Sequence, residues 1–370
     1  MTNVGSAGGS EPTCDPGSMN DDHDLDGFSE MQGDCNDCDP NVGPNAMEVS
    51  TPSETPADED CDGLIDEPAP TCDANLALGS QDAVEAARAL DICEAAGAQA
   101  SWGLVSAAYV RADGTAVQAA LSTGLLAAFG DNIVPRVGAR MLGLSSGHAR
   151  DAQDANACGS KSCATLGPGN PPAGFPQAVP GCGAPPTMIN DDIGLEIVLR
   201  APANAYGLAF DFAFLSFEYP GYVCTPVNDQ FVALVDPAPQ GSVNGNISFD
   251  GNGNTVSINT GFLGHCDPAT ITEFASTCAL LGNTQCPDPP NPYCPFGSSF
   301  LMGTGFDTWH GYAGATGWLT TTAPVSPNQD LSLRFAIWDT TDSSFDSTVL
   351  IDDFRWLATP ASIVTTPVPE

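Results

Sequence analysis

The sequence predicts a mainly β fold, with a β-sandwich body of the jelly-roll or lectin-like kind, a small acidic N-terminal module and one short helix. Three observations support this prediction. In several short segments apolar side chains alternate with smaller or polar ones, which is typical of strands with one buried face. The first 70 residues instead hold eighteen of the 46 Asp and Glu residues, no Lys or Arg, and almost no apolar periodicity. The run at residues 80–96 has the spacing of an amphipathic helix.

These changes in composition divide the 370 residues into five parts. We expect a flexible N-terminal segment at 1–13, an acidic repeat module at 14–70, a helical connector at 71–97, a β-sandwich at 98–358 and a C-terminal tail at 359–370. In the connector, Ser80 is the expected N-cap of the helix. Its apolar stripe is expected to consist of Val84, Ala87 and Leu90.

The strongest strand candidates are two segments in which four large apolar residues alternate with other residues. They are GLAFDFAFL at 207–215 and LSLRFAIW at 331–338. Shorter candidates have the β-branched and aromatic content of strands and are separated by turn residues; they are IGLEIVLRAP, QFVALV, NGNISFD, TVSINTGFL and TVLIDDFRW. Two sheets packed face to face would bury the apolar faces of these strands.

Charge and cysteine content exclude some classes of protein. The formal net charge of −37 repels nucleic acid and anionic membrane surfaces and attracts cations, so we expect no nucleic-acid partner. Fourteen cysteines with one Lys and four His are typical of disulfide-bonded proteins of an oxidising compartment. We therefore expect a secreted protein with an extracellular or cell-surface location. No apolar stretch approaches the about 20 residues that span a bilayer, so no transmembrane segment is predicted.

Cysteine spacing indicates several local disulfides. Cys72 and Cys93 flank the predicted helix and are candidates for a bridge. Two long connections are rich in Pro and Cys, and loops of this length are uncommon in compact domains unless they are fixed or functional. The candidate bridges in these connections are Cys158 to Cys163, Cys266 to Cys278, and Cys286 to Cys294.

Two DxDxDG motifs indicate how so many like charges fold together. In calcium loops, carboxylates at the first, third and fifth positions and a backbone carbonyl at the seventh bind one ion, and Gly at the sixth allows the sharp turn. The predicted Ca²⁺ ligands are Asp22, Asp24, Asp26, Phe28 and Asp34 in the first loop, and Asp58, Asp60, Asp62, Leu64 and Asp66 in the second. Neither loop has the Glu at position twelve or the flanking helices of an EF-hand. The free energy that orders this module is then expected to come mainly from the metal.

Two alternatives to calcium binding are open at this point. In one, the acidic segment is a solvated linker, although the repeated motif argues against it. In the other, Cys35 and Cys38 form a CxxC site for zinc or redox chemistry. Zinc would need a second CxxC or a pair of His at suitable spacing, and redox CxxC sites occur in βαβ units. The segment shows neither.

A second group of candidate calcium ligands lies in the predicted sandwich. Glu218, Asn228 and Asp229 follow the first aromatic strand, and three aspartates follow the second; these are Asp339, Asp342 and Asp346. Oxygen ligands on loops at one edge of a sandwich could hold calcium. The alternative is that Asp342 and Asp346 make turns, since no DxDxDG spacing supports this site.

The acidic module resembles a known repeat. The residues GFSEMQGDCNDCDPNVGPNAMEV followed by DEDCDGLIDE resemble the metal-binding repeat named after the surface protein MopE, found in exported proteins of myxobacteria, and also thrombospondin type 3 repeats. The resemblance covers about residues 14–67 and implies an exported, metal-binding module. Ser50 stands where the repeat commonly has Cys, which leaves one disulfide of the repeat unassigned, with Cys14 or Cys61 as its candidates.

The rest of the chain resembles the choice-of-anchor L domain of bacterial surface proteins, of the myxobacterial type. The residues that carry this resemblance include SWGLVSAAYVRADG, FAFLSFEYPGYVC, NDQFVALV, GATGWLTTTAPV and FAIWDTTDSSFDSTVLIDDFRW. The resemblance covers about residues 72–358. It implies a secreted, β-rich, surface-associated protein without a generally assigned reaction.

Three classes of function follow from these observations. The first is a calcium-binding structural or adhesive protein of the cell surface, in one version the subunit of an extracellular fibre. The second is a carbohydrate-binding module whose stacking rings would be Trp309, Tyr312, Trp318 and Tyr219. The third is a secreted hydrolase. No GxSxG, HExxH or phosphate-binding loop is found, and a lone His148 near Ser145 and Ser146 is more often structural, so we expect no enzyme.

The fibre hypothesis is based on the C-terminal tail. Residues 363–366, Ile-Val-Thr-Thr, favour a strand but follow the predicted end of the body. Such a tail could pair with the sheet edge of a neighbouring molecule. The expected partners are therefore other copies of this chain in a homopolymer, or a surface ligand such as a glycan.

Overall fold

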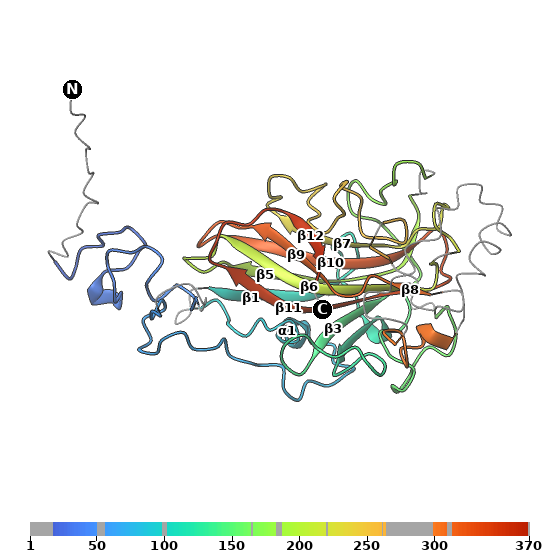
Figure 1. Cartoon of the computed structure of the whole chain (residues 1–370), viewed down its shortest axis with the longest axis horizontal. Helices are drawn as coiled ribbons and strands as arrows, with labels where there is room; N and C mark the ends of the chain where they lie inside the picture. Colours follow the sequence, from blue (N-terminus) through green and yellow to red (C-terminus); the bar gives the residue numbers. More distant parts are fainter. Residues whose placement is uncertain are drawn as a thin grey trace, which may run out of the picture. The chain divides into compact units, whose positions relative to one another are not determined.

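The computed structural model describes residues 18–49, 56–97, 102–163, 166–182, 187–219, 221–260, 262–263, 299–308 and 313–368. By its internal contacts the chain divides into two compact units. The smaller unit comprises the residues up to Ala69 together with Pro202–Asn204, and the larger unit comprises Pro70–Ala201 and Ala205–Glu370. Figure 1 shows the course of the chain through both.

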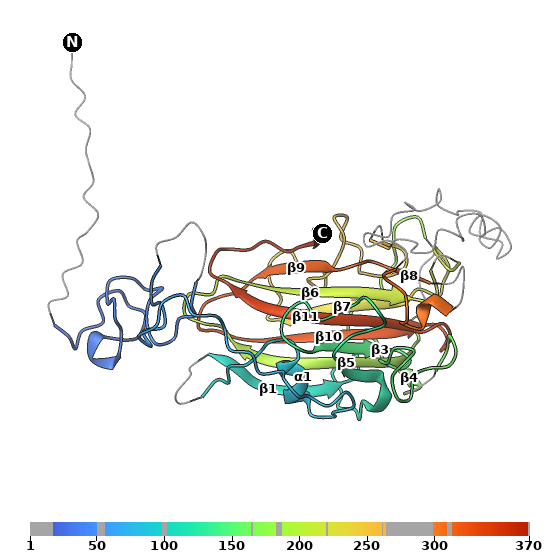
Figure 2. The ribbon, with the colours of Figure 1, turned by 60° about the horizontal axis from the view of Figure 1, so that its bottom comes forward.

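The larger unit contains two antiparallel sheets, which confirms the prediction of a mainly β, two-sheet body. One sheet has the order β1-β5-β10-β7, with β4 beside β5, and the other has the order β12-β9-β6-β11-β3-β2, with β8 beside β6. The strands are β1 (Gly103–Val110), β2 (Thr123–Leu126), β3 (Met141–Ser145), β4 (Pro168–Gly169), β5 (Ile189–Arg200), β6 (Gly207–Ser216), β7 (Gln230–Asp236), β8 (Gly314–Ala315), β9 (Leu319–Pro324), β10 (Asp330–Thr340), β11 (Ser347–Leu357) and β12 (Val364–Pro367). Figure 2 shows β9, β6 and β11 side by side, in agreement with their pairing.

Aromatic rings join the two sheets across the core. Phe210 of β6 lies against Phe335 of β10 with ring centroids 4.9 Å apart, and Phe212 of β6 lies 5.0 Å from Phe231 of β7. All four rings are fully buried. The predicted alternation is confirmed, because the core contains Leu208, Phe210, Phe212, Phe214, Leu331, Leu333, Phe335 and Ile337.

Strand β6 is buried on both faces, although its alternating pattern predicted one buried face. On the second face, Ala213 and Leu215 pack in a cluster with Phe129, Phe217 and Phe306. Phe217 stacks on Phe306 with ring centroids 4.2 Å apart. These rings come from connections between strands, so the connections cover the outer face of this sheet.

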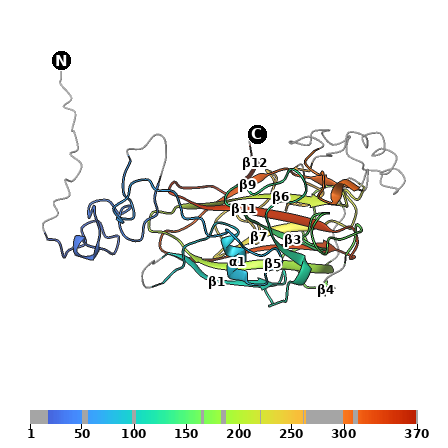
Figure 3. The same cartoon turned by 90° about the horizontal axis from the view of Figure 1, so that it is seen from below.

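The α-helix of the described residues, α1 (Ala83–Arg88), is shorter than the predicted segment 80–96. Its N-cap is Asp82 rather than Ser80, since Asp82 Oδ1 accepts a hydrogen bond from Val84 N at 2.9 Å. Val84 was predicted on the apolar stripe but is 37 % exposed. The buried stripe consists of Ala83, Ala86, Ala87 and Leu90, and Figure 3 shows α1 beside β1 and β5. The described residues also include short 3₁₀ turns at Glu30–Gln32, Ala120–Ser122 and Phe306–Thr308.

Disulfides fix several connections of the larger unit. The predicted bridges Cys72–Cys93 and Cys158–Cys163 are confirmed. Asp91 adopts a left-handed conformation (φ 64°) shortly after α1, and the chain turns toward the first bridge. A third bridge, Cys182–Cys224, was not predicted. The predicted pairs of Cys266 with Cys278 and Cys286 with Cys294 lie outside the described residues.

Two of the shorter strand predictions are wrong for the part of the chain that is described. Residues 244–250 and 255–260 form isolated bridges instead of strands, with Asn246 opposite Leu234 and Ser257 opposite Gln230 of β7. Asn244 (φ 53°) adopts a left-handed conformation and interrupts the extended backbone. This segment therefore lies along the outer edge of β7 without extending the sheet.

The C-terminal tail forms β12 on its own sheet. Residues Val364–Pro367 pair antiparallel with β9, and Thr365 lies opposite Thr321. The hydroxyl oxygens of these two threonines are 2.8 Å apart, and Val368 N donates to Trp318 O at 3.0 Å. The expectation that the tail lies beyond the body is thus corrected for residues 364–368.

Candidate metal sites

The first aspartate loop is closed by hydrogen bonds from its own backbone. Asp22 Oδ2 accepts from Gly27 N at 3.1 Å, and Asp24 Oδ1 accepts from Asp26 N at 3.1 Å. Asp26 Oδ1 accepts from Phe28 N at 2.7 Å. Each of the three carboxylates is therefore oriented by the chain that turns around it.

The second loop repeats this pattern position by position. Asp58 Oδ2 accepts from Gly63 N at 3.1 Å, Asp60 Oδ1 from Asp62 N at 3.1 Å, and Asp62 Oδ1 from Leu64 N at 2.8 Å. The fourth and sixth positions have positive φ in both loops: Leu25 (69°) and Gly27 (107°), and Cys61 (62°) and Gly63 (96°). Two separate segments thus share one loop geometry.

Carboxylate oxygens converge beside the first loop. Those of Asp24, Asp26 and Asp34 all lie within 4.8 Å of one another, and so do those of Asp22, Asp24 and Asp37. Two oxygens that each lie about 2.4 Å from one calcium ion are at most about 4.8 Å apart. The spacing therefore fits a calcium ion. One carboxylate oxygen each of Asp24 and Asp34 is buried without a hydrogen-bond partner.

Asp37 was not among the predicted ligands. Its Oδ1 accepts from His23 N at 2.9 Å, and its Oδ2 lies 2.6 Å from His23 Nδ1. The side-chain hydrogen bond to Asp37 raises the pKa of His23, and the hydrogen bond from the His23 backbone lowers the pKa of Asp37. His23, a non-ligand position of the loop, thus fixes one side of the carboxylate group.

Glu48 takes the central position beside the second loop. Its carboxylate lies within 4.8 Å of those of Asp60 and Glu67, which form one group, and of those of Glu59 and Asp66, which form another. Glu48 Oε1 accepts from Glu59 N at 2.9 Å, and Glu48 Oε2 accepts from Asp66 N at 2.8 Å. Three glutamates that the sequence analysis did not predict therefore join Asp60 and Asp66.

Burial and the crowding of these carboxylates oppose their ionisation. Burial, followed by the charge of neighbouring carboxylates, raises the pKa of Asp26 to about 6. The same causes raise the pKa of Asp24, Asp34 and Asp60. A bound cation reverses this effect, because it favours the ionised form of each ligand.

Apolar packing contributes little to this part of the chain. Within the described residues of 18–67, Ala46 is the one buried apolar side chain, whereas Asp34 and Asp37 are buried carboxylates. Large apolar side chains are exposed at Met19, Leu25, Met31, Leu64 and Ile65. Order in these residues therefore depends on hydrogen bonds and covalent links rather than on apolar packing.

The CxxC alternative is wrong. Cys35 is bonded to Cys61, and Cys38 is also disulfide-bonded. Neither sulfur is therefore a thiolate that could bind zinc or carry out thiol exchange as a CxxC pair.

The structure places four of the five sandwich candidates in the interior of one end of the larger unit. Glu218, Asp229, Asp339 and Asp346 are buried, and Asp342 is exposed. Burial raises the pKa of Asp229 to about 8 and that of Asp346 to about 7. It also holds the pKa of Glu218 and Asp339 well above the ordinary range.

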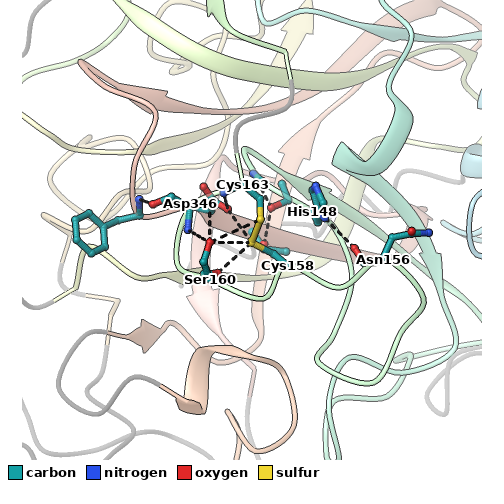
Figure 4. Close-up of a disulfide and its surroundings, with 11 residues drawn as sticks. His148, Asn156, Cys158, Ser160, Cys163 and Asp346 are labelled. Atoms are coloured by element: carbon teal, nitrogen blue, oxygen red, sulfur yellow. Dashed lines mark hydrogen bonds between the residues drawn. A yellow bond between two sulfur atoms is a disulfide. The ribbon is translucent and has the colours of Figure 1, made fainter.

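Figure 4 shows Asp346 beside the Cys158–Cys163 disulfide. Asp346 Oδ2 accepts a hydrogen bond from Cys163 N at 2.8 Å. The two sulfurs and this carboxylate lie close together, but the sulfurs are bonded to each other and provide no thiolate ligand. The disulfide loop therefore orients the carboxylate of Asp346.

His148 has no serine partner in the described structure. Its Nδ1 lies 2.8 Å from the carbonyl oxygen of Asn156, as Figure 4 shows. Ser145 Oγ and Ser146 Oγ both donate to Ser347 O. These contacts are structural and do not form the pair of nucleophile and base that hydrolysis would need.

Of the four aromatic residues proposed for sugar stacking, the structure describes two. Trp318 is 5 % exposed and Tyr219 is 3 % exposed, so both rings are buried. Trp309 and Tyr312 lie outside the described residues.

Comparison with known proteins identifies one domain. Residues 201–354 match the family model of the Choice-of-anchor L domain, which is less than half of the chain and shorter than the expected 72–358. The match spans β6 to most of β11. It includes the four buried sandwich candidates Glu218, Asp229, Asp339 and Asp346. No curated protein and no solved structure matches the chain. The resemblance of residues 14–67 to the MopE-type repeat stays a prediction.

The matched domain indicates a secreted or cell-surface protein. In the part of the chain that is described, no helix has both the length and the apolar character needed to cross a membrane.

Proposed function

We propose that this protein is a secreted structural or adhesive protein of the cell surface, in which calcium ions order the acidic segment of residues 18–67. The observation that carries the proposal is the shared geometry of the two aspartate loops in a segment with almost no apolar core. Their hydrogen bonds agree within 0.1 Å at three matched positions, Asp22 with Asp58, Asp24 with Asp60, and Asp26 with Asp62.

The chemistry of the ligands favours calcium over other metals. All the candidate groups are oxygens, which suit hard cations, whereas structural zinc sites use Cys and His. Magnesium requires near-ideal octahedral geometry at about 2.0–2.1 Å and keeps several waters. Calcium accepts six to eight oxygens in flexible geometry, and flexible geometry suits carboxylates that are held by loop backbone.

Calcium titration combined with limited proteolysis tests this function. Calcium should protect residues 18–67 from a protease, and a chelator should expose them before the body is cut. Asp24→Ala and Asp60→Ala should each lower the number of bound calcium ions and weaken protection at their own loop. A proteolysis pattern that is identical with and without calcium would exclude the proposed role.

Asp250→Ala is the matched control. Asp250 Oδ1 also accepts two backbone hydrogen bonds, from Asn252 N and Asn254 N at 2.9 Å each. Its turn shares the backbone hydrogen bonds to an Asp side chain, but it contains a single carboxylate and lies in the body. The control should bind as much calcium as the unchanged protein.

Assembly into a fibre is the more specific form of the proposal. Support comes from β12, a four-residue edge strand that pairs with β9 alone. A short edge strand can be exchanged between copies, so that β12 of one copy pairs with β9 of the next.

Carbohydrate binding is the alternative, and the burial of Trp318 and Tyr219 weakens it. A glycan array tests the alternative. Binding that is lost in Trp309→Ala and kept in Trp318→Phe would favour carbohydrate binding over a purely structural role. The expectation that the protein is not an enzyme stays a prediction. Turnover of polymeric sugars or peptides by the purified protein would refute it.

A further inference from the structure

The buried carboxylates of the larger unit lie where strand ends of the two sheets meet. Glu218 follows β6 by two residues and Asp346 immediately precedes β11, and these two strands pair in one sheet. Asp229 immediately precedes β7 and Asp339 is close to the end of β10, and these strands pair in the other sheet. Antiparallel pairing therefore brings all four carboxylates to the same end of the sandwich.

Asp229 links the two sheets by hydrogen bonds. Its Oδ1 accepts from Thr340 N at 3.1 Å, and its Oδ2 accepts from Ser347 Oγ at 2.6 Å. Thr340 belongs to β10 and Ser347 to β11, which are strands of different sheets. The Asp229 backbone N–H donates to Glu218 Oε2 at 3.1 Å. This network fixes the positions of two carboxylates inside the body.

Three further side-chain oxygens of residues at this end of the sandwich have no hydrogen-bond partner. Both carboxylate oxygens of Asp339 are buried and unpartnered, and so is the side-chain oxygen of Asn228. Asp339 is 1 % exposed and Asn228 is 2 % exposed. The Asp229 carboxylate and the Ser146 side chain lie within reach of Asp339, but neither Asp339 oxygen makes a hydrogen bond of good geometry. Buried polar groups are normally satisfied, so these unpartnered oxygens require an explanation.

No described basic side chain neutralises this cluster. Glu218, Asp229 and Asp339 take part in none of the ion pairs of the described residues. The other charges that act on them are the carboxylates of Asp342 and Asp346. Buried charges in proteins are paired or coordinate metals, and otherwise they take up protons.

We propose that Glu218, Asp229, Asp339 and the side-chain oxygen of Asn228 bind a calcium ion that holds the two sheets together at this end of the sandwich. The ligands are three carboxylates and one amide oxygen, a set that suits calcium. Asp346 is left out of this set because the disulfide loop that Figure 4 shows holds its Oδ2 through Cys163 N, although its Oδ1 is also buried without a hydrogen-bond partner. This site is separate from the aspartate loops and does not depend on calcium binding there.

Calcium content of variants tests the site. The full chain carrying Asp24→Ala and Asp60→Ala serves as the parent, so that the loops contribute little metal. Metal analysis after gel filtration in chelator-free buffer should find one calcium ion per parent chain and none in the Asp339→Asn variant. The control Asp342→Asn should retain the ion, because Asp342 is exposed and its Oδ1 accepts from Ser344 N at 2.9 Å.

Thermal unfolding distinguishes a bound cation from bound protons. If calcium neutralises the cluster, Asp339→Asn should lower the Tm in calcium and raise it above that of the parent after calcium has been removed by refolding in chelator. If protons neutralise the cluster, the substitution should leave the Tm unchanged or raise it in both buffers, and the parent should contain no calcium. The second result would overturn the proposal.

Glu218→Gln provides a second test if Asp339→Asn does not fold. The amide oxygen of Gln can still accept the hydrogen bond from Asp229 N, so the variant removes charge and keeps this contact. It should lose the calcium ion. Its Tm should be lower than that of the parent in calcium and higher than that of the parent after calcium has been removed. Retention of one calcium ion by a folded Glu218→Gln variant would overturn the assignment of Glu218 as a ligand.

Discussion

The disulfide between Cys35 and Cys61 links the end of the first acidic cluster to the turn of the second aspartate loop. Cys61 is the fourth residue of that loop, where the backbone has φ 62°, and Cys35 directly follows the buried Asp34. The bridge spans a sequence separation of 26 residues. In the chain-entropy account, a cross-link of this span destabilises the unfolded state by about 3–4 kcal/mol. If calcium orders this segment, as proposed above, the disulfide reduces the free energy that the ion has to supply.

Removal of this disulfide should raise the calcium requirement. In the double variant Cys35→Ser/Cys61→Ser, we expect the calcium concentration that gives half-maximal protease protection of residues 18–67 to rise by at least about tenfold, since 1.4 kcal/mol corresponds to a factor of ten. Cys72→Ser/Cys93→Ser removes a bridge of similar span, 21 residues, from the larger unit. It should leave that calcium midpoint unchanged. Equal midpoints in all three proteins would show that the Cys35–Cys61 bridge does not support metal binding.

The turn geometry of the two aspartate loops was predictable from the sequence because it is local. Positions one, three and five of each DxDxDG motif lie on one turn, and the Gly at position six fixes that turn through its positive φ. Asp37 and Glu48 were missed because they join the loops only through the fold of the whole segment. The sequence shows both residues close to the motifs: Asp37 lies between Cys35 and Cys38, and Glu48 precedes Val49. Spacing alone, however, does not indicate which carboxylates they approach.

The strands were predicted where large apolar residues alternate regularly with smaller ones. Phe210 and Phe212 alternate with smaller residues. This pattern indicates the strand although loops cover the other face of β6. The segment at 244–250 was predicted wrongly because its apolar residues pack on β7 from isolated bridges. Strand order was not predictable, since the pairing of β5 with β10 joins residues far apart in the chain and local pattern carries no information on partners.

The stability of the body should fall as pH rises toward 8. Burial raises the pKa of Asp352 to about 8, while Asp352 accepts hydrogen bonds from Arg136 N at 2.5 Å and Asp353 N at 2.8 Å. The unfolded chain ionises this carboxyl near pH 4, so between about pH 4 and pH 8 the folded state binds one more proton. This group alone then lowers the free energy of unfolding by at most about 1.4 kcal/mol per pH unit in that range.

Asp352→Asn should flatten this dependence. The amide oxygen of Asn can still accept from Arg136 N, and the amide does not titrate. We expect the difference in urea midpoint between pH 5 and pH 8, measured at constant calcium, to be smaller in the variant than in the unchanged protein. Asp250 is half-buried in a turn, and Asp250→Asn should keep the original difference. An unchanged pH dependence in Asp352→Asn would mean that another group is responsible.

The contact of Phe212 with Phe231 should be essential for the body. Both rings are fully buried and come from opposite sheets, 5.0 Å apart. Phe212→Ala should lower the free energy of unfolding by about 3–5 kcal/mol through loss of apolar contact and creation of a cavity. Val105→Ala removes an apolar side chain that is 45 % exposed, and it should change stability by no more than about 0.5 kcal/mol. Chemical denaturation of both variants in calcium measures the difference, and equal effects would contradict the observed packing.

Deletion of residues 360–370 should abolish self-association while the body stays folded. The deletion removes β12 and leaves the edge of β9 unpaired, but Thr321 keeps its contact with Ser248, whose hydroxyl lies 3.0 Å away. The unchanged protein should form species larger than the monomer by light scattering and filaments by electron microscopy, and the truncated protein should be monomeric. A peptide of residues 360–370 should bind the truncated protein, because it restores the missing strand. If the truncated protein still polymerises, exchange of β12 is not the means of assembly.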